Sequence, residues 1–272
     1  MPDKEAPIGL IAGQGDFPVL FAGAAASLGK KVVAFGIKGY TDPSLENHVV
    51  RAHYVELGEL EKLIGLLKEN GIRQVMLAVG VPKKEIYNPS FQIDSTAKNF
   101  LGGTKNKGDD HLLRAFQVFL KLRCGVSVVD SRKFLKNAMA PKGVLTARKP
   151  SAEEWEDLRF GWRIAKGIGK MDIGQTVVVK RGVVLAVEAI EGTDNAVRRG
   201  SELSQGGAVV VKVCKPRQNL RFDLPCVGRN TLETLKSVSS RVLGIEAGKT
   251  IMIFREKLIE EADRNELTIV GM

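Results

Sequence analysis

The chain has 272 residues, of which 44% are hydrophobic, and its 41 basic and 31 acidic side chains leave a formal charge of +10. That length suits one large domain or two smaller ones, and no apolar run approaches the roughly 18 residues that a membrane-spanning helix needs. The positive excess favours anionic partners, but only 6% of the residues are aromatic and no nucleic-acid-binding motif is found, so nucleic acid is not expected as a partner.

The first half of the chain alternates short apolar runs with amphipathic stretches, which is typical of a parallel sheet with crossover helices. Strands are predicted at residues 8–12, 31–36, 74–79 and 126–129, and helices at residues 17–28, 59–68 and 109–122. Repetition of this strand–helix unit predicts a Rossmann-like, doubly wound sheet that extends to about residue 132.

The second half has a different pattern. Glycine and proline concentrate between residues 135 and 150, where the interdomain connection is expected, and Ser151 with Glu154 forms a capping box that starts a helix to about residue 166. Strands are predicted at residues 176–180, 183–190, 208–213 and 250–254, and helices at residues 193–203 and 232–243. Arg181-Gly182 suggests a hairpin turn, although arginine is not favoured there. The sequence therefore predicts an α/β protein with a Rossmann-like domain, residues 1–135, and an α+β domain, residues 136–272.

A glycine turn follows the first predicted strand. Gly13, Gln14 and Gly15 stand between that strand and a helix with Pro18 in its first turn. Glycine lets the backbone turn tightly and approach a ligand, and N–H groups at a helix start can bind phosphate. Because Pro18 replaces the third glycine of the dinucleotide-binding pattern GxGxxG, NAD binding is not inferred, and a plain tight turn is the alternative.

Two further candidates come from a strand end and a helix start. Gly80 and residues 130–132 follow predicted strands, and ligands of open α/β sheets bind at the carboxyl ends of the strands. Asp109 and Asp110 follow Gly108 and open a predicted helix. Their carboxylates suit helix capping, which needs no ligand, and they also suit contact with a metal or a substrate.

The densest group of charged residues lies in the second half. Thr193 and Asp194 follow a predicted strand directly, and cations and carboxylates alternate beyond them in a segment that Pro216 and Pro225 interrupt. The candidates for binding or chemistry in this group are Thr193, Asp194, Lys212, Lys215, Gln218, Arg221 and Asp223. Such a loop suits phosphoryl chemistry, in which phosphate charge is neutralised and water or metal is positioned. The alternative is a solvated basic surface.

Other chemistries lack the residues they need. The three histidines are scattered and the three cysteines form no CxxC pair, so neither a Ser-His-Asp triad nor a zinc site is predicted. No signal-peptide pattern is recognised at the start. A cytoplasmic location is therefore expected.

Four motifs in the same order resemble the UDP-2,3-diacylglucosamine pyrophosphatases of the LpxI type. They are the glycine turn from Gly13 to Pro18, residues 108–110, residues 191–194, and the stretch from Lys212 through Arg221-Phe222-Asp223-Leu224-Pro225 to Thr231. The resemblance spans nearly the whole chain and implies hydrolysis of UDP-2,3-diacylglucosamine to UMP and 2,3-diacylglucosamine 1-phosphate, lipid X, in lipid A biosynthesis. It also implies a divalent cation, most often Mg²⁺, and an essential Asp223 with Arg221 beside it.

The resemblance leads to a hypothesis about the whole molecule. The nucleotide and sugar are expected in a cleft between the domains, with Asp223 as a metal ligand or as the residue that orients water. The basic surface is expected to contact the acidic inner membrane transiently, and homo-oligomer formation is left open. Asn219 stands where aspartate is expected in the family. A nucleotide- or lipid-binding protein without turnover and a Rossmann-type oxidoreductase are the alternatives.

Overall fold

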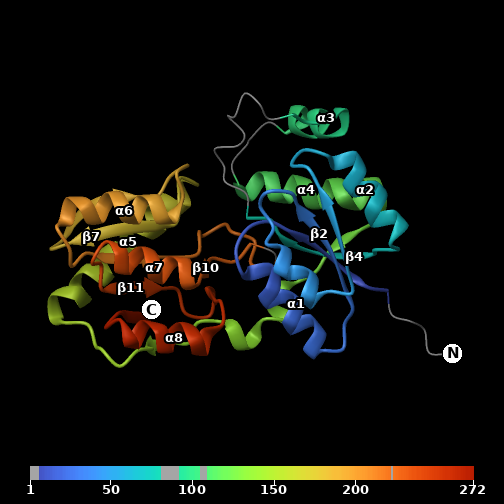
Figure 1. The fold of residues 1–272 in the computed structure, drawn as a ribbon. Coiled ribbons are helices and arrows are strands. Elements are labelled where there is room, and N and C mark those ends of the chain that lie inside the picture. The colour runs from blue at the N-terminus through green and yellow to red at the C-terminus, as the bar shows by residue number, and fades with distance from the viewer. Residues whose placement is uncertain (1–5, 81–91, 105–108, 222) are drawn as a thin grey trace. The chain divides into compact units, whose positions relative to one another are not determined.

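The computed structural model describes residues 6–80, 92–104, 109–221 and 223–272. The chain divides into two compact units, Met1–Leu135 with Asn219–Asp223, and Lys136–Gln218 with Leu224–Met272. Each unit is built around its own sheet (Figure 1). The short segment Asn219–Asp223 belongs to the first unit, although the residues on both sides of it belong to the second.

The first unit contains a five-stranded parallel sheet in the order β3-β2-β1-β4-β5. Its strands are β1 (Ile8–Ala12), β2 (Val32–Ile37), β3 (Arg51–Val55), β4 (Gln74–Ala78) and β5 (Ser127–Val128). Its helices are α1 (Phe17–Ser27), α2 (Leu60–Glu69), α3 (Ser95–Gly103) and α4 (Asp109–Cys124), with 3₁₀ turns at Pro43–His48 and Ser131–Lys133. Chain order reverses between β1 and β4, which is where ligands bind in sheets of this kind.

Both faces of this sheet are covered by helices. Phe21 and Ala25 of α1 pack on one face with Leu10 of β1. On the other face, α2 and α4 pack against Ile11 and Phe35. Because neighbouring residues of a strand point to opposite faces, the continuous apolar run of β1 supplies both cores.

The second unit contains a six-stranded mixed sheet in the order β6-β13-β11-β9-β7-β8 and a separate pair, β10-β12. Its strands are β6 (Gly143–Val144), β7 (Thr176–Lys180), β8 (Val183–Val187), β9 (Val209–Lys212), β10 (Cys226–Val227), β11 (Val242–Ile245), β12 (Ile251–Met252) and β13 (Thr268–Gly271). Its helices are α5 (Ala152–Lys170), α6 (Thr193–Ser204), α7 (Arg229–Ser237) and α8 (Arg255–Arg264), and a 3₁₀ turn lies at Lys136–Ala138. Helix α5 packs on one face, and α6, α7 and α8 pack on the other.

Two local predictions in this unit are confirmed. Ser151 and Glu154 form the capping box at the start of α5, with both reciprocal hydrogen bonds present. Strands β7 and β8 form the predicted hairpin. Arg181 adopts a positive φ of 50° in its turn, and Asp157 accepts hydrogen bonds from the N–H groups of Arg181 at 2.8 Å and Gly182 at 2.7 Å. These two bonds explain how an unfavoured residue is held in the turn.

Other predictions of elements were wrong. The helix predicted at 232–243 ends at Ser237, and Val242–Ile245 is the central strand β11. Ser239 has a φ of 55°, which ends the helix. Strands β3 and β13 and helices α3 and α8 were not predicted at all. Three parallel strands, β9, β11 and β13, make the second unit a mixed α/β sheet, where an α+β arrangement was expected.

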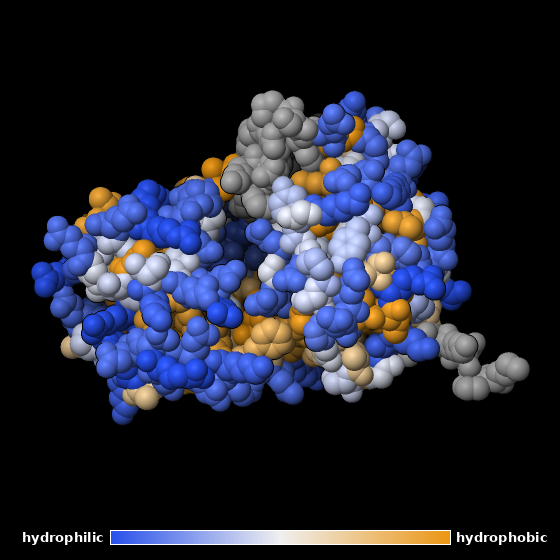
Figure 2. All heavy atoms as spheres, in the orientation of Figure 1, coloured by the Kyte–Doolittle hydropathy of each residue, from blue (hydrophilic) through white to orange (hydrophobic). Residues whose placement is uncertain are grey.

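The described surface is polar. Hydrophilic residues cover most of the face shown in Figure 2, in keeping with the charge of +10. Among the residues that the structure describes, no helix combines the length and the apolar character required to cross a bilayer.

Candidate functional site

The glycine turn after β1 lies against the end of β4. Gly13 donates its N–H to the Ala78 carbonyl at 2.9 Å, and Gln14 donates to the Gly80 carbonyl at 2.9 Å. A Cβ added to Gly13 would lie 2.5 Å from the Gly80 nitrogen, so no larger residue fits there. Gly15 has a φ of 83°, which favours glycine. The structure therefore brings the predicted residues Gly13, Gln14, Gly15 and Gly80 together at the point where the strand order reverses.

The amides in this turn are not equally available. Those of Gly13 and Gln14 are already hydrogen-bonded within the sheet edge. Helix α1 starts after Asp16, whose side chain makes no capping hydrogen bond. Pro18 has no N–H and Leu20 donates its N–H to the Asp16 carbonyl at 3.0 Å. The N–H groups of Phe17 and Val19 are the ones in this turn that could meet an anion, as at other helix N-termini.

A second group of charged residues follows β5 in the same unit. Arg132 forms a two-pronged ion pair with Asp130, Nε to Oδ1 at 2.9 Å and Nη2 to Oδ2 at 2.7 Å. This hydrogen-bonded pair, with a smaller contribution from the Arg221 charge, holds the pKa of Asp130 below its ordinary value. Asp130 is therefore an anion at neutral pH.

The segment Asn219–Asp223 is held at this place by the backbone. Ser131 donates its N–H to the Arg221 carbonyl at 2.7 Å. Asn219 accepts two hydrogen bonds, from the Arg221 N–H to its Oδ1 at 3.1 Å and from the Asp223 N–H to its carbonyl at 3.0 Å. Arg221 is exposed and Asp223 is half-buried. Asn219 thus stabilises the turn that presents these two side chains, and an aspartate could accept the same bonds.

One polar group at this point has no hydrogen-bond partner within the part of the chain that the structure describes. The Ser131 side chain is 1% exposed, and its hydroxyl makes no hydrogen bond among the described residues. Buried hydroxyls are normally paired with protein or water. This hydroxyl is a further group that a ligand or an ordered water would satisfy.

Three of the five residues predicted in and beside the basic loop are buried. Lys212 donates to the Cys226 carbonyl at 2.9 Å, and Lys215 donates to Asp172 at 2.7 Å. Gln218 Oε1 accepts from the Lys215 N–H at 3.0 Å. Lys212 is 8% exposed, Lys215 6% and Gln218 9%. These contacts fix the loop that leads into Asn219–Asp223, and contact between these side chains and substrate stays a prediction.

Thr193 and Asp194 begin α6. The Thr193 hydroxyl donates to Glu188 Oε1 at 3.0 Å, and the Glu188 carboxylate also accepts from the Gln175 N–H at 3.2 Å. Asp194 lies in the first turn, where its charge favours the helix dipole. Asp109 and Asp110 are the first residues of α4, but Gly108 and the two aspartate side chains lie outside the described residues.

Sequence reasoning missed the carboxylate at the carboxyl end of β11. Glu246 is 5% exposed and accepts hydrogen bonds from Lys166 of α5, from Lys249 at 2.9 Å and from the Cys214 N–H at 2.8 Å. Burial alone would raise the pKa of Glu246, but the hydrogen bonds from the two lysines and the amide outweigh it and lower the pKa. Its position directly after a strand was the signal, which the wrongly predicted helix concealed.

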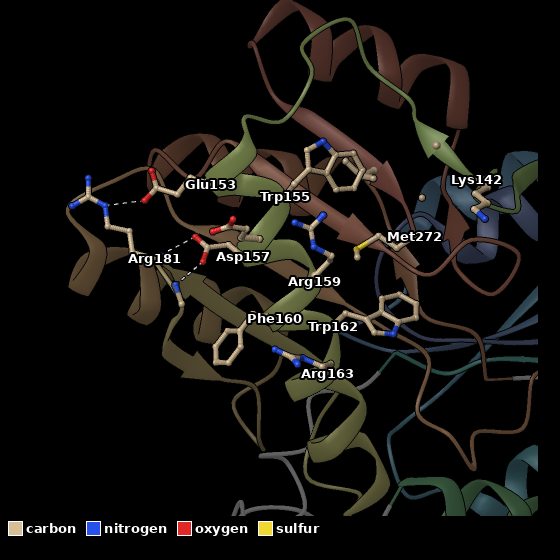
Figure 3. A pocket seen from close by; sticks show the side chains of 15 residues that line it. Lys142, Glu153, Trp155, Asp157, Arg159, Phe160, Trp162, Arg163, Arg181 and Met272 are labelled. Carbon is tan, nitrogen blue, oxygen red and sulfur yellow. Dashed lines mark hydrogen bonds and ion pairs between the residues drawn. The ribbon is translucent and has the colours of Figure 1, made fainter.

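A groove on α5 holds none of the predicted site residues. Its volume is about 960 Å³. Figure 3 shows Trp155, Arg159 and Trp162 leaving α5 toward Met272, with Phe160 and Arg163 on the neighbouring side of the helix. Its lining combines aromatic and aliphatic side chains with four exposed cations and three carboxylates. The cations are Lys142, Arg159, Arg163 and Arg181.

The described residues include no group of three His, Cys, Asp or Glu side chains that could hold a metal ion. Mg²⁺ does not require such a group, because it commonly binds one or two carboxylates together with water and substrate phosphates. The half-buried carboxylate of Asp223 has the oxygen donors that Mg²⁺ prefers. A single protein ligand completed by phosphate oxygens is therefore compatible with the donors present.

Comparisons with known proteins cover both units. The model of the LpxI N-terminal domain matches residues 7–138, and the model of the LpxI C-terminal domain matches residues 141–270. The UDP-2,3-diacylglucosamine pyrophosphatase LpxI of Caulobacter vibrioides is 32% identical over 279 aligned positions, which cover 97% of both proteins.

Solved structures give only weak similarity. A pyruvate carboxylase of Rhizobium etli with acetyl coenzyme A has a TM-score of 0.30 at 10% identity, covering 64% of this chain and 15% of that one. A leucoanthocyanidin reductase–NADPH complex of Vitis vinifera has a TM-score of 0.27 at 17% identity, covering 55% of this chain and 41% of that one. These scores are too low to indicate a shared fold.

Proposed function

The chain belongs to the LpxI family, and on this premise we propose that it hydrolyses the pyrophosphate bond of UDP-2,3-diacylglucosamine. The products are UMP and 2,3-diacylglucosamine 1-phosphate, so the reaction serves lipid A biosynthesis. Support comes from family matches to both parts of the chain and from a relative of that activity aligned along 97% of each sequence.

The observation that carries the proposal is the placement of Asn219–Asp223 within the first unit. The hydrogen bond from Ser131 to the Arg221 carbonyl joins this segment to the end of β5. The glycine turn lies at the carboxyl end of β1 in the same parallel sheet. The first unit therefore contains the glycine turn together with Arg221 and Asp223, although these residues lie far apart in the sequence.

Each group has a task in the proposed chemistry. The N–H groups of Phe17 and Val19, in the first turn of α1, bind pyrophosphate oxygens. Arg221 neutralises charge that develops on the phosphoryl group as the bond breaks, and Asp223 orients the attacking water. A Mg²⁺ ion, when bound, would supply further charge neutralisation, and Asp223 with phosphate oxygens would hold it.

Replacing one carboxylate tests this function. We expect Asp223→Asn to reduce UMP release from UDP-2,3-diacylglucosamine by at least about 100-fold, because removal of a single well-placed group commonly costs that much. The thermal unfolding midpoint should stay within a few degrees of the wild-type value, since the side chain is only half-buried. Near-normal turnover by this variant would remove Asp223 from the mechanism.

Two control measurements define the alternatives. Chelation with EDTA followed by Mg²⁺ addition tests the metal directly, and UMP release that persists in EDTA would contradict the metal proposal. Wild-type protein that binds the substrate and releases no UMP in Mg²⁺ would be a binding protein without turnover.

We also propose that the groove on α5 contacts an anionic membrane surface. The chain has two tryptophans, and both line this groove beside Arg159 and Arg163. Tryptophan and basic residues together are typical of membrane interfaces. Asp157 and Glu153, two of the three carboxylates, already bind Arg181 or its turn. The remaining cations are therefore suited to acidic headgroups.

A further inference from the structure

Besides the groove on α5, the structure has an apolar cavity in the first unit, at the carboxyl edge of that unit's sheet. Its volume is about 190 Å³. Ile11, Ile37 and Val55 close it from the ends of β1, β2 and β3, and Val79 closes it just beyond β4. The cavity therefore opens at the sheet edge on which the glycine turn lies.

Helices α2, α3 and α4 form the other walls. Leu60 and Leu63 line the cavity from α2, Phe100 from α3, and Leu113 and Phe116 from α4. The Phe100 and Phe116 rings pack edge to face with centroids 5.8 Å apart. All but Leu63 keep partial solvent exposure, so apolar side chains from three helices face a space that they do not fill.

Asp94 holds this wall in place. Its carboxylate accepts the Ala97 N–H of α3 at 2.7 Å and the Glu61 N–H of α2 at 2.8 Å. Its own N–H donates to the Gly58 carbonyl at 3.2 Å. One side chain thus caps both helices and fixes the position of α3 relative to α2. The cavity wall formed by α2 and α3 is therefore fixed by hydrogen bonds from Asp94 to both helices.

Two carboxylates, Glu56 and Glu59, line the cavity, but their charge is largely balanced by neighbouring lysines. Glu56 forms an ion pair with Lys38 at 2.8 Å, and Glu59 forms one with Lys62 at 3.0 Å. An amphiphile with a negative headgroup is therefore not repelled by unpaired acids in this lining. The apolar character of the interior excludes a second charged ligand.

The cavity lies close along the chain to the proposed phosphate-binding turn. Val79, which lines it, immediately precedes Gly80, and Gly80 contacts Gly13 and Gln14. Ile11, also in the lining, is two residues before Gly13. A ligand that spans both places has a phosphate at one end and a hydrocarbon at the other.

We propose that this cavity binds part of an acyl chain of the substrate, an inference that rests on the proposed hydrolysis of UDP-2,3-diacylglucosamine. If a methylene takes about the 30 Å³ that water takes in the liquid, the cavity holds about six. Each methylene that leaves water contributes about fourfold to kcat/KM. The dependence on chain length should level off once the cavity is full.

A substrate series from butanoyl to tetradecanoyl chains tests the proposal against two matched variants. Leu113→Trp fills the cavity from α4, whereas Leu122→Trp places the same ring on the same helix at a side chain that is 80% exposed. For the wild type and Leu122→Trp, kcat/KM should rise about fourfold per methylene before it levels off. For Leu113→Trp, it should stay nearly flat with chain length.

A binding measurement separates the cavity from catalysis. Cis-parinaric acid, whose conjugated chain fluoresces when it leaves water, should bind the wild type and Leu122→Trp equally and Leu113→Trp at least about tenfold more weakly. If Leu113→Trp fails to fold, Phe116→Ala provides the opposite test, because it enlarges the cavity and should move the plateau to longer chains.

The outcomes keep the two proposals apart. Chain-length dependence that is the same in Leu113→Trp and Leu122→Trp, together with unchanged probe binding, would overturn the acyl site and identify the cavity as a packing gap. Failure of every form to release UMP, with probe binding still lost in Leu113→Trp, would overturn the hydrolase and leave a chain-binding cavity.

Discussion

At the scale of single residues, the backbones of Gly13 and Gly80 approach each other closely at the candidate site. We expect Gly13→Ala to destabilise the protein by about 1–3 kcal/mol, because the new methyl would lie 2.5 Å from backbone that must shift. Gly23→Ala, in α1, is the matched control, since its methyl meets no atom within 4 Å and should stabilise the helix by about 0.5–1 kcal/mol. Urea unfolding of the two variants measures both changes. Equal free energies of unfolding for the two variants would show that the backbone around Gly13 shifts without an energetic cost.

Single residues differed in how much of their surroundings the sequence revealed. Gly13 and Gly15 were predicted because a tight turn imposes its requirement locally, on the residue itself. Lys212 and Lys215 were predicted as substrate ligands from their charge, and that contact stays a prediction, but a sequence does not show the partners of a charge. Their partners, the Cys226 carbonyl and Asp172, lie far along the chain, and only the fold reveals that both lysines are buried.

At the scale of elements, Glu246 joins the carboxyl end of β11 to α5 and to Cys214, two residues after β9. We expect Glu246→Gln to lower the free energy of unfolding by about 1–3 kcal/mol at neutral pH, because Lys166 and Lys249 lose a charged acceptor. Folding lowers the pKa of Glu246 from its ordinary value of 4.5, so its contribution is present above that value and is lost as the pH falls below it.

Urea unfolding at neutral pH and at about pH 3 checks the sign, since the stability gap between wild type and Glu246→Gln should narrow in acid. Glu233→Gln is the control, because its ion pair with Arg229 is exposed and should change stability by less than about 0.5 kcal/mol. A difference in the free energy of unfolding between wild type and Glu246→Gln that grows in acid would contradict the lowered pKa of Glu246.

Elements with strong local signals were predicted well, and those defined by long-range pairing were not. The capping box located the start of α5, and alternating runs located β1, β7 and β9. Strand β11 has a short apolar sequence that follows a helical pattern, and periodicity alone does not separate a buried strand from a helix. Its pairing with β9 and β13 decides the outcome.

At the scale of the whole molecule, sequence patterns indicated a break near residue 135 but not the return of Asn219–Asp223 to the first unit. That return includes the backbone hydrogen bond between Ser131 and Arg221, which no local pattern encodes. The recognisable motif around Asp223 therefore predicted candidate site residues, but the predicted boundaries assigned them to the second domain, residues 136–272.

The net charge of +10 and the tryptophan groove together predict membrane binding that salt weakens. Both tryptophans line the groove, so their emission should shift to the blue when vesicles containing phosphatidylglycerol are added. Raising NaCl from about 0.1 M to about 1 M shortens the screening length from about 10 Å to about 3 Å and should release the protein.

Charge reversal identifies the surface responsible. Arg159→Glu with Arg163→Glu should weaken vesicle binding at least about tenfold, since each basic residue near an anionic surface contributes about 1 kcal/mol. Lys236→Glu with Lys257→Glu makes the same change in net charge on α7 and α8, which pack on the other sheet face. That pair should weaken binding much less. Equal losses would mean that net charge alone draws the protein to lipid, and an unshifted emission would mean that the α5 groove stays in water.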